Sequence, residues 1–331
     1  GKLVLVPSDP KAGERVITAG QFSMDFDTRN RPKNLRGLSG TRIVFQPPKD
    51  APPGSLPQES SSDRLEAEFD PSTQTLRALQ QVGAFQFREG DRLASAERAD
   101  YQSQPETLAL SGRPQVWDPE TRIGAERIIF DLRNSTAEGL GRVQSSHFEN
   151  AGRPEAGRND PTNVLADRVV ADRRSQFVHY EGNVRAWRGQ DVVESSSLDV
   201  YRAQRRVRSG SRVLTSHLQP ASMVARGTPD AATKEDTRPV TIRADRLEYF
   251  DQGRKASYRG NVQLQAEKTT LLADRVDVYF SAAASGGSSR VERAVAEGHV
   301  RVAQPGRRAA GQHADYFAAE GKILLAGGPP T

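Results

Sequence analysis

The chain has 331 residues, a length that fits either one large β domain or two smaller domains. It contains no cysteine, which excludes disulfide bonds, thiolate metal sites and cysteine nucleophiles. Its 39 Arg and 8 Lys exceed its 42 acidic residues by five, and the two signs are mixed along the whole chain. This mixing argues against a nucleic-acid platform. No run of 18 apolar residues is present that would span a bilayer as a helix.

Short alternating runs of apolar and polar residues predict β-strands, and helical periodicity is nearly absent. In the clearest run, 256–264, four apolar residues share one parity and would share one face of a strand: Ala256, Tyr258, Val262 and Leu264. Stretches rich in Gly, Pro and Ser interrupt these runs and predict loops at 149–161, 220–239 and 281–289. The sequence therefore predicts an all-β chain.

A motif recurs along the chain, consisting of a small residue, an acid, an Arg and then an apolar alternation. In chain order its copies begin at Ser62, Ala96, Ala125, Ala166, Ala244 and Ala273. Degenerate copies begin at Ser196 and Gln312, and a faint further copy begins near Gln21. A repeat of this kind predicts one structural unit used many times.

Each copy is followed by a second half, a Gly that opens an apolar strand. The clear cases are Gly182-Asn183-Val184, Gly260-Asn261-Val262 and Gly298-His299-Val300, and Gly112 and Gly210 occupy equivalent places. Arg168 to Gly182 and Arg246 to Gly260 are both intervals of 14 residues. Such an interval fits one strand and a short turn, so each full unit predicts a hairpin and its return. A parallel β-solenoid is the alternative, and the uneven loop insertions favour antiparallel sheets.

The acid–Arg position coincides with a change of phase. Leu271 and Ala273 have odd numbers, whereas Val276, Val278 and Phe280 have even numbers. Because side chains alternate with period two, both sets share a face only if an extra residue is inserted, and we predict a bulge or corner at each Asp-Arg. A carboxylate that recurs six times is better explained as a structural element than as a catalytic or metal-binding group. The Gly of each second half likewise predicts a bulge or a close backbone approach.

These paired motifs resemble the OstA-like family of lipopolysaccharide-transport proteins, the Lpt β-jellyroll proteins. The family includes a periplasmic bridge protein, its membrane-anchored neighbour and the periplasmic domain of the outer-membrane translocon. Residues 162–331 resemble it best, above all 244–280, and residues 16–148 match more loosely. The resemblance implies an antiparallel, two-sheet, open β-jellyroll that holds lipid acyl chains between its sheets. It also implies edge pairing with other OstA-like proteins or head-to-tail self-association in the periplasm.

On this basis we expect two jellyroll modules, 1–148 and 162–331, joined by a linker or loop at 149–161, with a loop at 220–239 inside the second module. A signal peptide or anchor before Gly1 is expected to be absent from the sequence because it has been removed. The candidate groove residues are the inward apolar positions of the second module: Val169, Val184, Leu247, Val262, Leu264, Val276, Val278, Phe280, Val300 and Val302. Ordinary core packing is the alternative for each of them.

Other chemistry is sparse, and no catalytic residue, metal site or cofactor is expected. The five histidines have no metal-ligand spacing, and no nucleophile elbow, phosphate loop or nicotinamide fingerprint is present. Trp117 and Trp187 are interpreted as strand residues. Three functions fit the sequence: a noncatalytic lipopolysaccharide carrier, which the resemblance favours; a structural or adhesive β-repeat protein with a closed core; and a carbohydrate-active enzyme on a β scaffold with paired carboxylates.

Overall fold

The structure is a computed structural model that describes residues 1–5, 13–48, 50–52, 54–148, 161–220, 237–266, 268–281, 290–318, 320 and 322–328. Every regular element in these ranges is a β-strand, and neighbouring strands pair antiparallel. The predicted all-β fold of repeated antiparallel hairpins is therefore confirmed. Within the same ranges, no helix is long and apolar enough to cross a membrane.

The chain divides into two compact units. Unit 1 comprises Gly1–His147 and Val170–Arg173, and unit 2 comprises Phe148–Val169 and Arg174–Thr331. The strands of unit 1 are β1 (Lys2–Leu5), β2 (Glu14–Phe26), β3 (Pro32–Gln46), β4 (Gln58–Ser62), β5 (Arg64–Phe69), β6 (Leu76–Glu89), β7 (Arg92–Ser103), β8 (Glu106–Ser111), β9 (Gln115–Trp117), β10 (Thr121–Gly124), β11 (Arg127–Asp131) and β12 (Thr136–His147).

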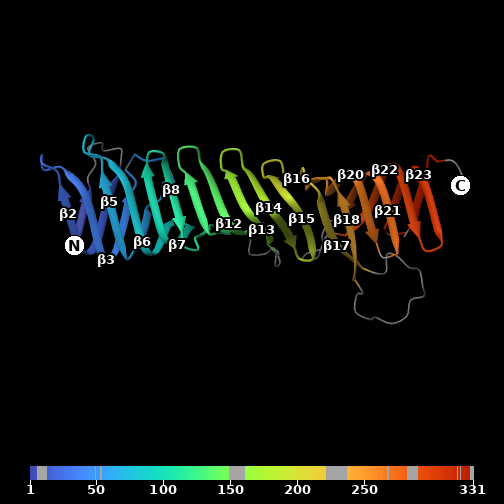
Figure 1. Cartoon of the computed structure of the whole chain (residues 1–331), viewed down its shortest axis with the longest axis horizontal. Coiled ribbons are helices and arrows are strands. Elements are labelled where there is room, and N and C mark those ends of the chain that lie inside the picture. Colours follow the sequence, from blue (N-terminus) through green and yellow to red (C-terminus); the bar gives the residue numbers. More distant parts are fainter. Residues whose placement is uncertain are drawn as a thin grey trace. The chain divides into compact units, whose positions relative to one another are not determined.

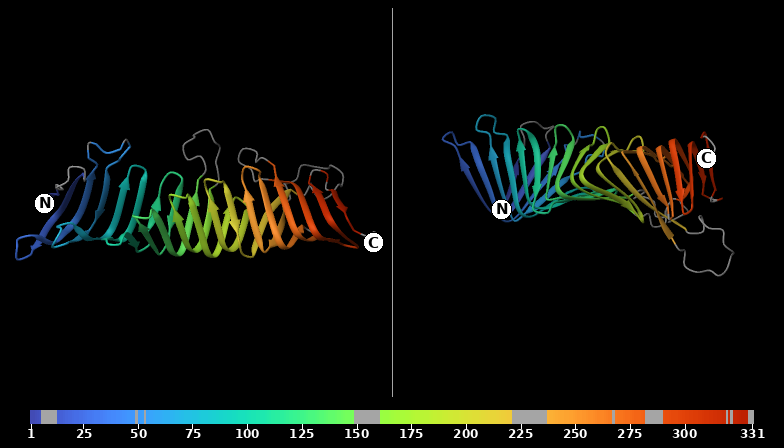
Figure 2. Two further views of the ribbon diagram at one scale, coloured as in Figure 1. Left: turned by 90° about the horizontal axis from the view of Figure 1, so that it is seen from above. Right: turned by 45° about the vertical axis from the view of Figure 1, so that its right-hand side comes forward.

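Strand β13 (Thr162–Asp172) contributes residues to both units. The remaining strands of unit 2 are β14 (Phe177–Arg188), β15 (Asp191–Tyr201), β16 (Arg206–Ser209), β17 (Val213–Pro220), β18 (Thr237–Ala244), β19 (Arg246–Phe250), β20 (Lys255–Ala266), β21 (Thr269–Phe280), β22 (Val291–Gln304), β23 (Arg307–Phe317) and β24 (Lys322–Ala326). Within each unit the strands follow one another along the sheet in nearly the order of the chain (Figures 1 and 2).

The three predicted loops lie largely outside the described residues. Only their ends can be compared with the structure. Pro220 ends β17, and Thr237–Pro239 begin β18 and pair with it, so the predicted loop at 220–239 is shorter than expected. The division of the chain into two jellyroll modules, 1–148 and 162–331, remains a prediction.

Most long strands of unit 2 bend in the middle, and their two parts belong to two half-sheets. Half-sheet A consists of 184–188, 191–195, β17, β18, 262–266, 269–273, 300–304 and 307–311. Half-sheet B consists of 177–181, 197–201, β16, β19, 255–259, 275–280, 291–297, 313–317 and β24. The two sheets of the expected jellyroll are thus the two halves of the same bent strands.

The corner predicted at each Asp-Arg is present, and the extra residue that it needs lies on the neighbouring strand. In β20, Arg259 pairs with Arg275 and Val262 pairs with Ala273, so Gly260 and Asn261 together face the single residue Asp274. Both bulge residues have left-handed backbone, with φ of 79° at Gly260 and 48° at Asn261. Equivalent bulges interrupt β6, β14 and β22 at their Gly residues. The predicted bulge at the Gly is therefore confirmed.

The recurring acid packs onto this Gly. A Cβ placed on Gly260 would lie 2.6 Å from Oδ2 of Asp245, so only Gly leaves room for the carboxylate. Asn261 Nδ2 donates a hydrogen bond to the same oxygen at 2.7 Å, and the Asp245 amide donates to the Gly260 carbonyl at 2.9 Å. The other acid–glycine contacts of this kind are Asp63–Gly83, Glu97–Gly112, Glu126–Gly141, Asp167–Gly182 and Asp274–Gly298. We call this arrangement the acid–glycine corner.

Replacing Gly260 by Ala should destabilise the chain, because a left-handed L-residue costs about 1–2 kcal/mol and the new methyl group would displace Asp245. Gly210→Ala is the matched control, since a Cβ at Gly210 meets no atom within 4 Å. Urea denaturation of the full chain should therefore show a lower midpoint for Gly260→Ala and a change below about 0.5 kcal/mol for Gly210→Ala. Equal midpoints for the two variants would contradict the steric role of the corner.

Replacing Asp245 by Ala should lower the free energy of unfolding by roughly 0.5–1.5 kcal/mol through loss of a solvent-exposed hydrogen bond. A larger cost would require a buried carboxylate, and Asp245 is exposed. The double variant Asp245→Ala/Asn261→Ala should cost little more than Asp245→Ala, because both changes remove one interaction. Additive losses in urea denaturation would show that the two side chains act independently.

Candidate functional site

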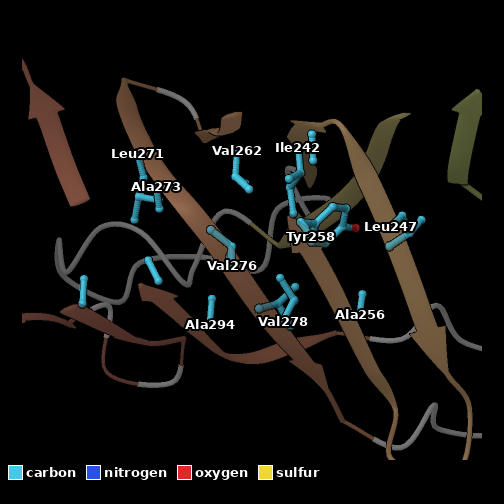
Figure 3. Close-up of a cluster of buried hydrophobic side chains, with 14 of the residues drawn as sticks. Ile242, Leu247, Ala256, Tyr258, Val262, Leu271, Ala273, Val276, Val278 and Ala294 are labelled. Carbon is cyan, nitrogen blue, oxygen red and sulfur yellow. The ribbon is translucent and has the colours of Figure 1, made fainter. Parts of the chain in front are cut away.

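The interior of unit 2, between half-sheets A and B, is filled by apolar side chains from both (Figure 3). Ile242, Val262, Leu271 and Ala273 come from half-sheet A and lie in the same cluster as residues of half-sheet B. The buried contributors from half-sheet B are Leu247, Ala256, Tyr258, Val276, Val278, Phe280, Val291, Ala294, Ala296 and Ala314. The phase change at Asp274-Arg275 thus keeps Leu271 and Val276 on one interior, as the sequence predicts.

The ten candidate groove residues all point into the interior of unit 2 or are buried in it. Six belong to the core cluster described above: Leu247, Val262, Val276, Val278, Phe280 and Val300. Leu264 and Val302 are half-buried and pack against that cluster, and Val169 and Val184 are buried outside it. In this structure these side chains form a packed core, and their service as a lipid groove remains a prediction.

The two half-sheets touch at the ends of their strands that lie away from the corners. The ring of His217, on half-sheet A, lies 5.4 Å from the ring of Phe280, on half-sheet B, measured between centroids. Tyr249 adds an edge contact to Phe280 at 6.5 Å, and Asp191 Oδ1 lies 3.1 Å from His217 Nδ1. The contact of His217 with Phe280 joins the two half-sheets at this end of the interior, and we call it the mouth contact.

One polar pair lies inside this apolar region. The hydroxyl groups of Tyr258 and Thr215 are 2.9 Å apart, and both side chains are almost completely buried. Burial raises the pKa of Tyr258 far above its ordinary value, and the negative charge of Asp191 raises it further, against the effect of the Thr215 hydrogen bond. Tyr258 is therefore neutral at physiological pH, and the interior carries no charge at this point.

Tyr258→Phe should destabilise unit 2 by about 1–3 kcal/mol, because it leaves the buried Thr215 hydroxyl without its partner. The double variant Tyr258→Phe/Thr215→Val removes both polar groups and should recover most of that loss. Thermal or urea denaturation of the full chain measures both. If the double variant is less stable than Tyr258→Phe, the pair does not form an isolated buried hydrogen bond.

The buried apolar residues of unit 1 include two clusters, one around Leu35 and Leu65 and the other around Leu110 and Ile128. A cavity of about 180 Å³ lies among residues of both clusters. Its lining consists of four apolar residues, Ile43, Phe45, Leu79 and Phe87, and four polar residues, Arg15, Gln58, Glu59 and Ser60. The Arg15 guanidinium lies over the Phe45 ring at 5.4 Å from the centroid.

A cavity of this volume can accept an apolar group, since engineered apolar cavities of roughly 150 Å³ bind benzene. The sequence reasoning missed it, because all ten candidates were taken from the better-matching half of the chain. The alternation Ile43, Phe45 and Phe85, Phe87 is visible in the sequence and marks inward strand faces. Whether such faces meet tightly or leave a void depends on the sizes of side chains from four strands, which alternation does not give.

The remaining polar groups form ion pairs and hydrogen bonds along and between neighbouring strands. Among the residues whose placement is described, no group of three His, Asp or Glu side chains could hold a metal ion. Four histidines each lie within hydrogen-bond distance of an aspartate: His179–Asp199, His217–Asp191, His299–Asp274 and His313–Asp315. Trp117 and Trp187 lie in β9 and β14, as expected of strand residues.

Comparison with known proteins bears on the half of the chain that carries the packed interior. The family model for the LptA/(LptD N-terminal domain) LPS transport protein matches residues 163–252 and again residues 241–329. The chain belongs to this family. The predicted family is thereby confirmed, and family membership gives the chain a role in lipopolysaccharide transport.

A solved structure is similar over a shorter stretch. It is the crystal structure of LptH, the LptA homologous periplasmic component of the conserved lipopolysaccharide transport device from Pseudomonas aeruginosa. The identity is 16%, the match covers 37% of this chain and 78% of that chain, and the TM-score is 0.30. No curated protein matches the chain.

Proposed function

We propose that the chain is a noncatalytic carrier that binds lipopolysaccharide acyl chains between its half-sheets and passes them toward the outer membrane. The observation that carries the proposal is the uncharged interior of unit 2, which a lipid-transport family member builds from both half-sheets. Each methylene group transferred from water to such an interior contributes about 0.8 kcal/mol. A chain of ordinary acyl length is therefore held without any catalytic or charged residue.

Lipid entry into unit 2 requires the half-sheets to separate. The core side chains of the described residues pack together in the interior, and an acyl chain would replace the contact of His217 with Phe280 as it enters. The acid–glycine corners lie on the other side of the strands and stay closed during this motion. The two half-sheets then move apart while they remain joined along the line of acid–glycine corners.

Unit 1 offers a site that needs no such opening. Its cavity of about 180 Å³ already exposes Phe87, Leu79 and Ile43 to a small apolar group. Arg15 lies at the same cavity and supplies a cation for a phosphate or carboxylate beside the buried chain. We infer that the first acyl segment enters here.

We infer that the carrier works in the periplasm, because lipopolysaccharide crosses this compartment on its way to the outer membrane. Its partners are lipopolysaccharide, other proteins of the family and further copies of the chain. Edge-strand pairing supplies the protein contacts: in the described part of the chain, β24 pairs only with β23, so one side of its backbone is open to another strand. Leu324 on this strand is 47% exposed.

A photo-crosslinking amino acid at Phe280 or Phe87 should capture lipopolysaccharide in cells, since both side chains face an interior. Leu272 is the matched control for Phe280, because it lies on the same strand and its side chain is 40% exposed on the outer face of half-sheet A. We expect lipid adducts at Phe280 and Phe87 and a much weaker signal at Leu272. Equal labelling at all three positions would mean surface contact only, and no labelling inside would favour the closed structural repeat, which the filled core of unit 2 also fits.

Crosslinkers at exposed leucines test the edge pairing separately. Leu324 lies on the edge strand β24, and Leu272, 40% exposed, lies on the central strand β21. With purified chain, a crosslinker at Leu324 should yield dimers and higher multimers whose abundance rises with concentration, whereas Leu272 should yield few. Multimers of equal abundance from both positions would exclude a specific role of the β24 edge.

A further inference from the structure

A continuous row of aromatic and basic side chains crosses the outer face of half-sheet B. Strand register places one member on each of nine neighbouring strands, in the order Phe177, Tyr201, Arg206, Phe250, Lys255, Tyr279, Arg293, Phe317 and Lys322. Their neighbours Tyr249, Val278 and Tyr316 pack into the core, so the row faces away from it. At a strand spacing of about 4.8 Å the row is about 40 Å long.

The cations of the row stack on its rings. Arg206 lies 4.2 Å from the centroid of Tyr201, Lys255 lies 5.3 Å from that of Tyr279, and Arg293 lies 5.5 Å from that of Phe317. All the row members are at least partly accessible, and Phe250 is 38% exposed. Each of these three rings thus has a cation over one face.

The neighbouring row of residues on the same outer face, two positions closer to the acid–glycine corners, contains carboxylates that bind these cations. Arg206, Lys255 and Arg293 form ion pairs with Glu248, Asp277 and Asp315. That inner row also contains Asp199, Arg208 and His179. These carboxylates therefore offset the charge of three cations of the row. The excess positive charge lies in the turns at the rim of half-sheet B.

The turns beyond the row supply this charge. Five exposed arginines lie in or beside them: Arg174, Arg202, Arg205, Arg254 and Arg290. Against these, the same described turn residues contain two acids, Asp251, which is paired with Arg205, and Glu320. The rim of half-sheet B thus carries a basic margin outside an aromatic row.

Unit 1 shows that the fold does not require this surface. Its strands carry the same acid–glycine corners, and the positions five residues from those corners form the equivalent row. These positions hold no aromatic and no basic residue: Glu68, Ala78, Gln102, Thr107, Asp131 and Thr136. The aromatic and basic row is therefore a property of unit 2 rather than of the repeat.

We propose that the rim of half-sheet B docks on the surface of a bilayer that contains anionic phospholipid. Aromatic rings beside Arg and Lys form the belts by which proteins sit at membrane–water interfaces. The basic turns match the negative surface potential of such a bilayer, and each basic residue near it strengthens binding roughly fivefold. The half-exposed rings lie behind these turns, at the depth of the lipid headgroups. Docking on a bilayer is a separate property from the proposed binding of acyl chains in the interior. It can be tested independently of that binding.

Vesicle co-sedimentation of the full chain tests the proposal. Vesicles of phosphatidylglycerol and phosphatidylcholine in equal parts should bind the chain, with affinity that falls as salt rises, and pure phosphatidylcholine vesicles should bind it at least tenfold more weakly. Arg202→Glu/Arg254→Glu should lower affinity for the mixed vesicles at least tenfold, and Phe250→Ser/Tyr279→Ser should lower it severalfold. Arg133→Glu and Gln102→Ser, in the equivalent turn and row of unit 1, are the matched controls and should leave binding unchanged.

The turn substitutions lie in exposed positions, and circular dichroism confirms that each variant is folded. If the unit 1 controls weaken binding as much as the unit 2 variants, or if mixed and neutral vesicles bind equally, the assignment is wrong. Binding of a deacylated, phosphorylated oligosaccharide with no binding of mixed vesicles would assign the surface to a soluble anionic glycan and overturn it. In cells, the unit 2 variants that carry a photo-crosslinker at Phe87 should still capture lipid. If a chain that binds mixed vesicles normally captures no lipid at Phe87, the result counts against the carrier function and leaves the docking surface standing.

Discussion

The contact between a carboxylate and a left-handed glycine organises this fold. Because Asp245 occupies the space of the missing Cβ of Gly260, the strand that contains the glycine bends while its neighbours remain hydrogen-bonded. The bulge inserts the extra residue that keeps apolar side chains on one interior through the bend. Repetition of this contact along the chain turns a series of hairpins into two half-sheets with a common core. The acids that a catalytic interpretation would select are used at these corners.

The two units use the same corner for different interiors. In unit 2, many small β-branched and alanine side chains from both half-sheets meet in a packed cluster. In unit 1, the bulkier Phe45 and Phe87 line a cavity beside the clusters around Leu35 and Leu110. Since the backbone frame is shared, side-chain volume decides whether an interior is filled or hollow. The cavity thus lies in the unit outside the residues that the family model matches.

Sequence reasoning succeeds where the physical signal is local. The period of two predicts the strands, and the phase change at Asp274-Arg275 predicts the corner, because both follow from backbone geometry. It could not place the partner of each acid, since the Gly260 that receives Asp245 lies on another strand. It also could not show that His217 meets Phe280, a contact that depends on how far two half-sheets close. Groove and core are the same inward positions in the sequence, so alternation alone cannot distinguish them.

Sequence reasoning also missed the aromatic and basic row on the outer face of half-sheet B, although its members recur at a constant distance from the corners. Tyr279 lies five residues after Asp274, and Lys255 lies five residues before Gly260. Antiparallel pairing brings these positions side by side, which converts a sequence interval into a line of alternating rings and cations. Tyr279 and Phe280 then face opposite sides of one strand. A bilayer docked on the outer row would therefore lie one side chain away from the mouth contact, where the proposed function has an acyl chain separate the half-sheets.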